Sequence, residues 1–406
     1  MALADVPAIL ILAGLAAYTV LAGADFGAGL WYLQAGPRAK GRPVRDFTYH
    51  AMAPVWEANH VWLIFVLVVT WTAYPTAFGS IASTLAVPLF IAAVGIIMRG
   101  ASYALRSGQD VESETEGVVG FLFGASSFLT PFALGAAIGA IAGGRVPVGN
   151  AAGHLITSWV NLISIMTGVL AVAISAFLSA VYLAADATRA GDERLAGAFQ
   201  RRALVMGVAA GGLAIAGLFV LHADARALYD GLTSGAGLAA VLISVLAGIV
   251  ALALVRARRY EPARAVAALA VVAIIAGWGI AQSPYILPGL TIHVAAAGHA
   301  TLVALLIAVA GGLVVLVPSL FLLFRLVLKG RLDTTAPTLE QRPPARLPGR
   351  PRPLAAIALG LLVTGAALLV LGDGVLLAIG VVTLVAFTIV GVTELLQPET
   401  LQRPGS

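Results

Sequence analysis

Long apolar runs separated by short polar loops dominate the pattern of this chain. A run of about 18 or more apolar residues is long enough to cross the hydrocarbon core of a bilayer as a helix. The pattern predicts such helices at residues 8–34, 55–73, 77–105, 117–142, 155–185, 201–221, 236–256, 263–281, 297–328, 354–371 and 374–395. The sequence therefore predicts an all-α polytopic membrane protein with eleven spans.

Composition agrees with this class. Of the 406 residues, 60% are hydrophobic and 11% are charged, whereas a soluble domain carries about 25% charged residues. The chain has no cysteine, which excludes disulfides, thiolate metal sites, iron–sulfur clusters and covalently attached c-type haem. Phosphate-binding, zinc-protease and serine-hydrolase motifs are absent as well. We expect no metal-binding, cofactor-binding or catalytic residues in this chain, and no nucleic-acid partner.

The basic residues alternate between the loops. If the N-terminus lies outside, only Arg145 and Arg226 fall in outer loops, and Arg99 lies inside a span. The positive-inside rule therefore predicts an N-out, C-in orientation. The other 21 of the 24 basic residues fall on the inner side, at positions 38, 40, 42, 45, 106, 189, 194, 201, 202, 256, 258, 259, 264, 325, 329, 331, 342, 346, 350, 352 and 403.

A proline- and arginine-rich segment divides the chain. Residues 329–353 contain six prolines, a composition typical of an extended linker. We expect a nine-helix membrane domain over residues 1–328, a cytoplasmic linker over 329–353 and a C-terminal transmembrane hairpin over 354–396.

Three of the first spans carry ionisable groups at one predicted depth, towards the cytoplasm. They are Asp25, Glu57 with His60 one turn deeper, and Arg99, while Asn59 lies between the two polar residues of the second span. A charge at mid-helix costs about 2.5–3.5 kcal/mol on insertion, so these groups should face the bundle interior and pair. Two interpretations stay open: a structural ion cluster, to which we assign Arg99 and Asn59, or a protonatable relay formed by Asp25, Glu57 and His60.

Four stretches resemble one family in the same order along the chain. GADFGAGLW at 23–31, APVWEANHVWLI at 53–64, MRGASYALR at 98–106 and GWGIAQSPYILPGLTI at 277–292 resemble subunit II of the cytochrome bd-type quinol oxidases. The resemblance spans the nine-helix domain. It implies two four-helix bundles with one peripheral helix, in the plasma membrane of a bacterium.

The resemblance also implies a function. In this family a heterodimer of the respiratory chain oxidises quinol from the membrane pool and reduces dioxygen to water. Subunit I carries haem b, haem d and the quinol site, whereas subunit II is haem-free and supports assembly. A small accessory membrane subunit is often present, and the C-terminal hairpin of this chain could cover its position.

A proton route has been assigned to subunit II in this family, and its acidic residues match Asp25 and Glu57. Family members often carry a second acid three residues before Asp25, where this chain has Ala22. Either the relay is shorter here, or water and His60 replace the missing group.

Two other classes compete with the oxidase interpretation. A proton-coupled secondary transporter would use Asp25, Glu57 and Arg99 as its substrate site, but such sites lie near the midplane on broken helices, and these charges lie towards one face. The other class is a purely structural scaffold. The QSPY segment at 282–285 is predicted to end the eighth helix, because Pro284 and Pro288 interrupt helical hydrogen bonding.

Overall fold

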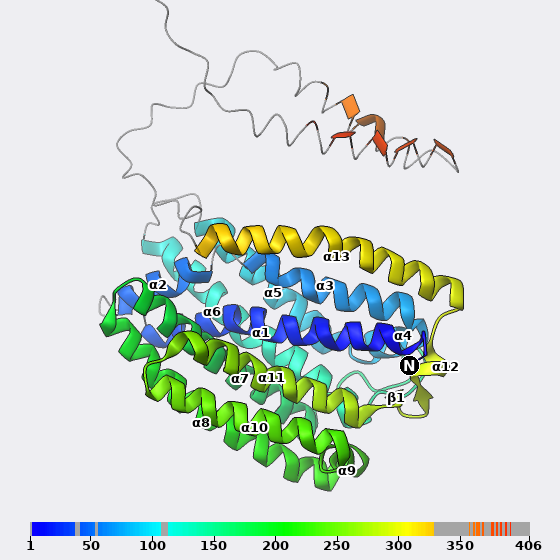
Figure 1. Ribbon diagram of the computed structural model, residues 1–406, viewed down its shortest axis with the longest axis horizontal. Coiled ribbons are helices and arrows are strands. Elements are labelled where there is room, and N and C mark those ends of the chain that lie inside the picture. Colours follow the sequence, from blue (N-terminus) through cyan, green and yellow to red (C-terminus); the bar gives the residue numbers. More distant parts are fainter. Residues whose placement is uncertain are drawn as a thin grey trace, which may run out of the picture. The chain divides into compact units, whose positions relative to one another are not determined.

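The computed structural model describes residues 2–36, 41–52, 56–106 and 113–328, with scattered positions between 357 and 390. The chain divides into two units, residues 1–328 and 329–406. The predicted linker at 329–353 lies outside the described residues, and of the predicted hairpin at 354–396 only scattered helical positions lie within them. All labelled elements belong to the first unit (Figure 1).

Helices make up nearly all of the described part of the first unit. A two-stranded antiparallel hairpin, β1 (Tyr285–Leu287) and β2 (Leu290–Thr291), is the exception. The helices are α1 (Asp5–Ala35), α2 (Arg42–Met52), α3 (Trp56–Ala73), α4 (Pro75–Thr84), α5 (Ala86–Arg106), α6 (Ser113–Ala142), α7 (Leu162–Arg189), α8 (Glu193–Asp224), α9 (Arg226–Leu232), α10 (Gly235–Arg256), α11 (Tyr260–Gln282), α12 (Ile292–Ala295) and α13 (His299–Leu328).

Among the described residues, eight helices are long and apolar enough to cross a membrane: α1, α5, α6, α7, α8, α10, α11 and α13. A ninth, α3, has a shorter described apolar stretch, Asn59–Ala73. Each predicted span between residues 8 and 328 overlaps one of these nine helices. The prediction of an all-α polytopic membrane protein is therefore confirmed.

Two predicted spans are not helical throughout. The span expected at 77–105 is divided at Leu85 into α4 and α5, because Pro88 has no N–H to donate to the carbonyl of Thr84. The span expected at 155–185 begins only at Leu162. Asn161 ends the preceding turns and caps α7, with its Oδ1 accepting from the Ser164 backbone N–H at 3.1 Å.

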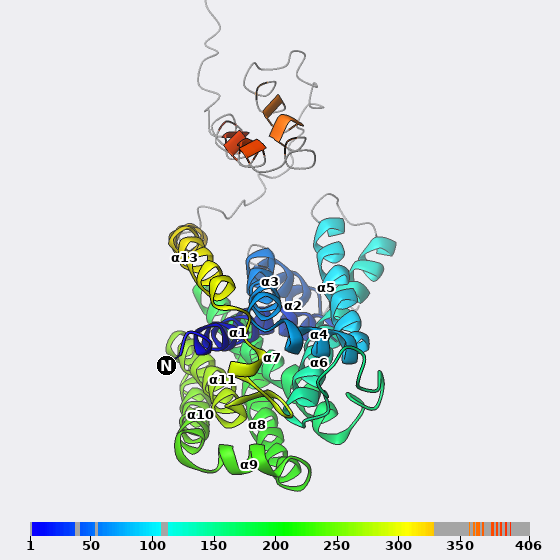
Figure 2. The same cartoon turned by 90° about the vertical axis from the view of Figure 1, so that its right-hand side faces the viewer.

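The long helices pack as two groups of four. In the first, α1 packs against α3 and α6, and α5 packs against α6; in the second, α7, α8, α10 and α11 contact one another. Helix α1 lies between the groups and also packs against α7 and α11 (Figure 2). Helix α13 runs along α3 at the side of the first group (Figure 1).

The connections gather at two ends, which we call the α9 end and the α2 end. At the α9 end, the Tyr74 hydroxyl donates to the carbonyl of Ala4 at 2.5 Å, and the Ala297 N–H donates to the carbonyl of Ala73 at 2.8 Å. The α2 end holds α2 and the turns at 190–192 and 257–259. The described loops that the basic residues assigned to one side of the membrane therefore lie at the same end of the helices.

Candidate functional site: a buried ion pair and its neighbours on α1, α3 and α5

An ion pair between α1 and α5 lies at the centre of the site. Both side chains, Asp25 and Arg99, are completely buried. Arg99 Nη2 lies 2.7 Å from Asp25 Oδ1 and also donates to the backbone carbonyl of Asp25, while Nε lies 3.4 Å from Oδ2. The cost of inserting lone charges led us to expect such pairing, and these two residues are in contact.

The rest of the guanidinium is satisfied by α6. Arg99 Nη1 donates to the Phe123 carbonyl at 3.2 Å and to Ser127 Oγ at 2.9 Å. The guanidinium carbon also lies 3.9 Å from the centroid of the Phe123 ring, a favourable cation–π geometry at a buried site. One side chain thereby ties α5 to both α1 and α6.

Tyr103 completes the coordination of the carboxylate. Its hydroxyl donates to Asp25 Oδ1 at 2.9 Å, and its ring stacks on Trp56 of α3, with centroids 5.2 Å apart and an interplanar angle of 17°. The cluster therefore extends to α3. A buried ion pair is stable only when its remaining hydrogen-bonding groups are satisfied, and these contacts satisfy them.

A glycine makes room for the guanidinium. A Cβ atom on Gly29 would lie 2.8 Å from Arg99 Nη1 and 2.8 Å from the Phe123 carbonyl oxygen, and would overlap Ser127 Oγ. Such distances leave no space for a methyl group. The small residues of the GADFGAGLW stretch thus allow α6 and Arg99 to approach the backbone of α1.

His60 lies on α3 beside the same part of α1. Its Nδ1 is 2.7 Å from the carbonyl of Trp56; because a carbonyl only accepts, Nδ1 carries the proton. Its Nε2 is buried and has no hydrogen-bond partner among the described residues. The imidazole meets the Phe26 ring edge-on, with centroids 5.8 Å apart. Nε2 is thus the free acid–base position of this histidine.

Tyr18 presents a second unsatisfied polar atom next to His60. Its hydroxyl is buried without a partner in the described part of the chain, and its ring centroid lies 6.0 Å from that of His60. Buried polar groups are nearly always hydrogen-bonded, to protein or to ordered water. Two unsatisfied atoms on neighbouring rings therefore mark a place where water would be bound.

The remaining predicted site residues are on α3. Asn59 is buried, and its Nδ2 donates to the carbonyl of Leu21 at 3.3 Å, so it joins α3 to α1. Glu57 belongs to α3 by its backbone, but its side chain lies outside the described residues. Of the five predicted residues, the structure brings Asp25 and Arg99 into contact and places His60 and Asn59 against the neighbouring turns of α1.

Ala22 is the position at which the resemblance to the oxidase subunits implies an acid in many relatives. It is 1% exposed and packs with Tyr18 and Phe26. Those are the two α1 rings that His60 meets edge-on. The imidazole of this chain therefore lies beside the position of the missing carboxyl group.

Three contributors were missed in the sequence: Tyr18, Tyr103 and Ser127. Helical spacing held a signal for the first two. Tyr18 is seven residues before Asp25 and Tyr103 four residues after Arg99, so each shares a helix face with a charged residue. Nothing in the sequence pattern singled out Ser127, because serine is common in membrane helices.

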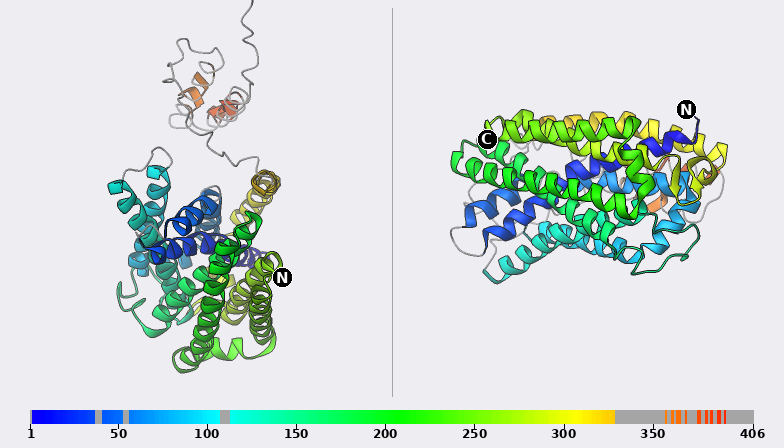
Figure 3. Two further views of the ribbon diagram at one scale, coloured as in Figure 1. Left: turned by 90° about the vertical axis from the view of Figure 1, so that its left-hand side faces the viewer. Right: turned by 90° about the horizontal axis from the view of Figure 1, so that it is seen from below.

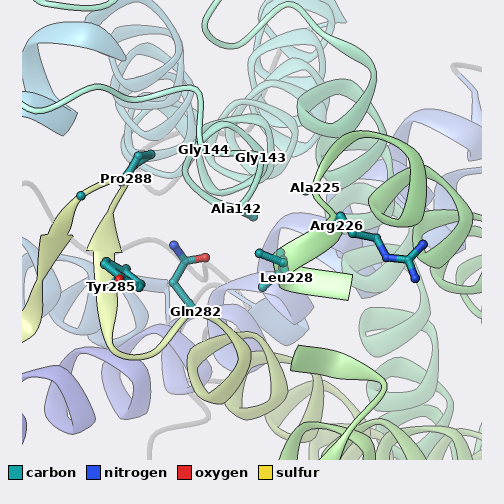
Figure 4. Close-up of a pocket in the computed structure, with 11 residues that line it drawn as sticks. Ala142, Gly143, Gly144, Ala225, Arg226, Leu228, Gln282, Tyr285 and Pro288 are labelled. Atoms are coloured by element: carbon teal, nitrogen blue, oxygen red, sulfur yellow. The ribbon is translucent and has the colours of Figure 1, made fainter. Parts of the chain in front are cut away.

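At the α9 end, helix α11 ends at Gln282, as the QSPY segment predicted. The residues that follow line a pocket of about 380 Å³ with the end of α6 and the start of α9 (Figure 4). Its polar side chains are Gln282, Tyr285 and Arg226. Arg226 is paired with Asp230 at 3.0 Å, which leaves the pocket mostly apolar.

The described residues contain no group of three or more His, Cys, Asp or Glu side chains placed to hold a metal ion. His154 and His293 are near the α9 end, where His154 Nδ1 accepts from the Ile156 N–H at 3.2 Å and His293 Nε2 lies 3.4 Å from Asp5. The first contact lies within one turn, and the second joins α12 to the first turn of α1.

These features define a polytopic helical membrane protein whose buried charges compensate one another inside the bundle. Residues 3–327 match the family model described as cytochrome bd terminal oxidase subunit II. The chain belongs to this family and is a subunit of a respiratory oxidoreductase. Membership of this family does not favour the alternative of a proton-coupled secondary transporter.

Solved structures agree with this assignment. The chain is similar to a chain of the bd oxidase from Geobacillus thermodenitrificans, with a TM-score of 0.65 and 27% sequence identity, over 81% of this chain and 99% of that one. A comparison with curated proteins finds no match.

Proposed function

We propose that this chain is the haem-free subunit II of a bd-type quinol:dioxygen oxidoreductase in a bacterial plasma membrane. It assembles with a subunit I that carries haem b, haem d and the quinol site. Membership of the subunit II family is the observation that carries the proposal.

The α2 end faces the cytoplasm in this proposal. Arg42, Arg189, Arg201, Arg256 and Arg264 lie towards this end, whereas the described basic residues at the α9 end are Arg145 and Arg226. By the positive-inside rule, the end with the excess of arginine stays in the cytoplasm. Helix α1 then begins outside.

We further infer a proton-uptake route that starts from the cytoplasm at Glu57 and continues through His60 towards Asp25. The unsatisfied Nε2 of His60 and the unsatisfied hydroxyl of Tyr18 support this route. A water bound between them would extend a hydrogen-bonded chain along α1, and an imidazole can both accept and release a proton.

In this proposal the route starts at the cytoplasmic surface and ends at Asp25, inside the helix bundle. The Asp25 carboxylate is held in place by Arg99 and Tyr103, next to Phe26, whose ring His60 meets edge-on. Because His60 lies beside Ala22, we assign to the imidazole and its bound water the role that an acid at position 22 has in relatives.

The haem-free assignment is tested by replacing each of the six histidines singly with glutamine in the complete oxidase. The purified complexes should keep the absorption bands of haem b and haem d. Selective loss of one haem band from an assembled complex would show that a histidine of this chain is a haem ligand, and the assignment would be wrong.

A further inference from the structure

The second helix group ends, at the α2 end, in a network of ion pairs that uses all its described acidic side chains. Arg264 pairs with Asp186, Arg189 Nε lies 2.8 Å from Glu261, and Arg258 lies 3.6 Å from Glu193. The last acid, Asp192, caps α8 by accepting from the Leu195 N–H at 2.9 Å. No carboxylate of this network is left over for another cation.

Four arginines at the same end have no such partner. Arg194, Arg201, Arg256 and Arg259 are exposed and form no ion pair with the described residues. The proposed proton route does not use them. They give this end of α8, α10 and α11 an uncompensated positive charge.

The turn of α8 that carries Arg201 meets the end of α10 that carries Arg256. The side-chain amide of Gln200 donates to the carbonyl of Val255 at 2.8 Å and to that of Arg256 at 3.2 Å. One to two turns further along, α8 and α10 touch, where Gly207 meets Leu252. Figure 3 shows the two green helices, α8 and α10, from below in its right panel.

An apolar stripe runs along α8 directly from Arg201. Val205, Val208, Ile215 and Phe219 follow at helical spacing on the same face. All four are strongly exposed, with Val205 at 67% and Phe219 at 73%. The stripe therefore begins at an unpaired guanidinium and continues over about five turns of apolar surface.

A matching stripe runs along α10 towards Arg256. Leu242, Leu246 and Ile249 precede it at spacings of four, three and seven residues, again on one helix face. Leu246 is 61% exposed and Ile249 is 59% exposed. At the opposite end of these helices, Arg226 is neutralised by Asp230, so among the described residues the unpaired arginines that adjoin the stripes lie at the α2 end.

We propose that this surface binds an anionic phospholipid of the bilayer. The headgroup phosphate lies between Arg201 and Arg256, with Arg194 and Arg259 nearby, and the acyl chains lie along the two stripes. Guanidinium groups match phosphate in charge and hydrogen-bond geometry. A basic cluster at the cytoplasmic ends of helices attracts anionic headgroups, and the adjoining exposed apolar surface suits acyl chains rather than a free anion in water.

Native mass spectrometry of the purified oxidase, titrated with phosphatidylglycerol or phosphatidylcholine in detergent, tests this site. The parent complex should retain phosphatidylglycerol in preference to phosphatidylcholine, and inorganic phosphate should not compete. The double variant Arg201→Gln/Arg256→Gln should bind phosphatidylglycerol about tenfold more weakly or worse, because two headgroup contacts are lost. Arg145→Gln, an exposed arginine at the α9 end, is the matched control and should bind like the parent.

Three results would overturn the proposal. One is equal phosphatidylglycerol binding by the double variant and the parent, and another is an equal loss in the Arg145→Gln control. The third is a protein subunit that covers Arg201 and Arg256, detected as their protection from arginine-modifying reagents in lipid-free complex. The variants alter exposed side chains, and thermal unfolding of each complex shows that it is folded.

Discussion

Arg99 and Asp25 form a completely buried ion pair, 2.7 Å from Nη2 to Oδ1, that joins α5 to α1. Bulk solvent does not reach either charged side chain. Removing one partner of such a pair leaves a buried charge without compensation, whereas replacing both with apolar groups is often tolerated. Helices α1 and α5 therefore pack stably against each other only when both residues are present.

Removing the carboxylate should destabilise the subunit strongly. Asp25→Asn leaves the Arg99 guanidinium buried and uncompensated, at a cost of roughly 3–5 kcal/mol. The double variant Asp25→Leu/Arg99→Met should recover most of that loss. Thermal unfolding of the purified complex measures both. A single variant as stable as the parent would show that the pair does not hold the two helices together.

Tyr103→Phe should have a smaller effect. The change removes one hydrogen bond to the carboxylate, worth about 1.5–3 kcal/mol for a charged acceptor, but keeps the ring that stacks on Trp56. We expect the unfolding temperature to fall between those of the parent and Asp25→Asn. A larger loss of stability than that of Asp25→Asn would contradict the prediction that this hydrogen bond contributes less than the ion pair.

Gly29→Ala should prevent normal assembly. The added methyl group would lie 2.8 Å from Arg99 Nη1 and from the Phe123 carbonyl oxygen, and both are held in place by the ion pair and by α6. The matched control is Gly211→Ala on α8, where nothing lies within 4 Å of the new methyl group. That control should be neutral or slightly stabilising, since alanine is the better helix former. Equal yields of assembled complex from both variants would refute the steric argument.

The ion pair could be predicted because insertion cost and the alternating helix direction act together. The sequence places Asp25 and Arg99 at one depth in the first and third spans. Because a lone charge in a membrane costs free energy, the two residues are expected to pair. The helix break at Leu85 was missed because the apolar run continues through it, and only Pro88 marks the interruption.

The rest of the site depends on rotations of helices about their axes, which apolar periodicity does not fix in a bundle that is apolar all round. The approach of Tyr18 to His60, and of Ser127 to Arg99, required the three-dimensional packing of α1 against α3 and of α5 against α6. The stacking of Tyr103 on Trp56 is a contact of the same kind.

Tyr18→Phe separates structure from proton transfer. The hydroxyl has no partner among the described residues, so its removal should leave stability unchanged or slightly higher, because no hydrogen bond within the protein is lost. If the hydroxyl binds the water beside His60, proton uptake should slow while the haem spectrum stays unchanged. A lower unfolding temperature with unaltered proton uptake would assign Tyr18 a packing role instead.

The central claim is that this subunit conducts protons from the α2 end into the interior of the oxidase complex. Proton uptake during a single turnover of oxygen reduction, followed with a pH-sensitive dye in the purified complex, tests it most directly. Glu57→Gln should slow uptake roughly tenfold or more, since a positioned acid–base group contributes at least that much. Glu193→Gln, an exposed glutamate at the same end, should leave the rate unchanged, and both variants should retain all haem bands. Proton uptake by Glu57→Gln at the parent rate, in a complex with intact haem spectra, would contradict the claim.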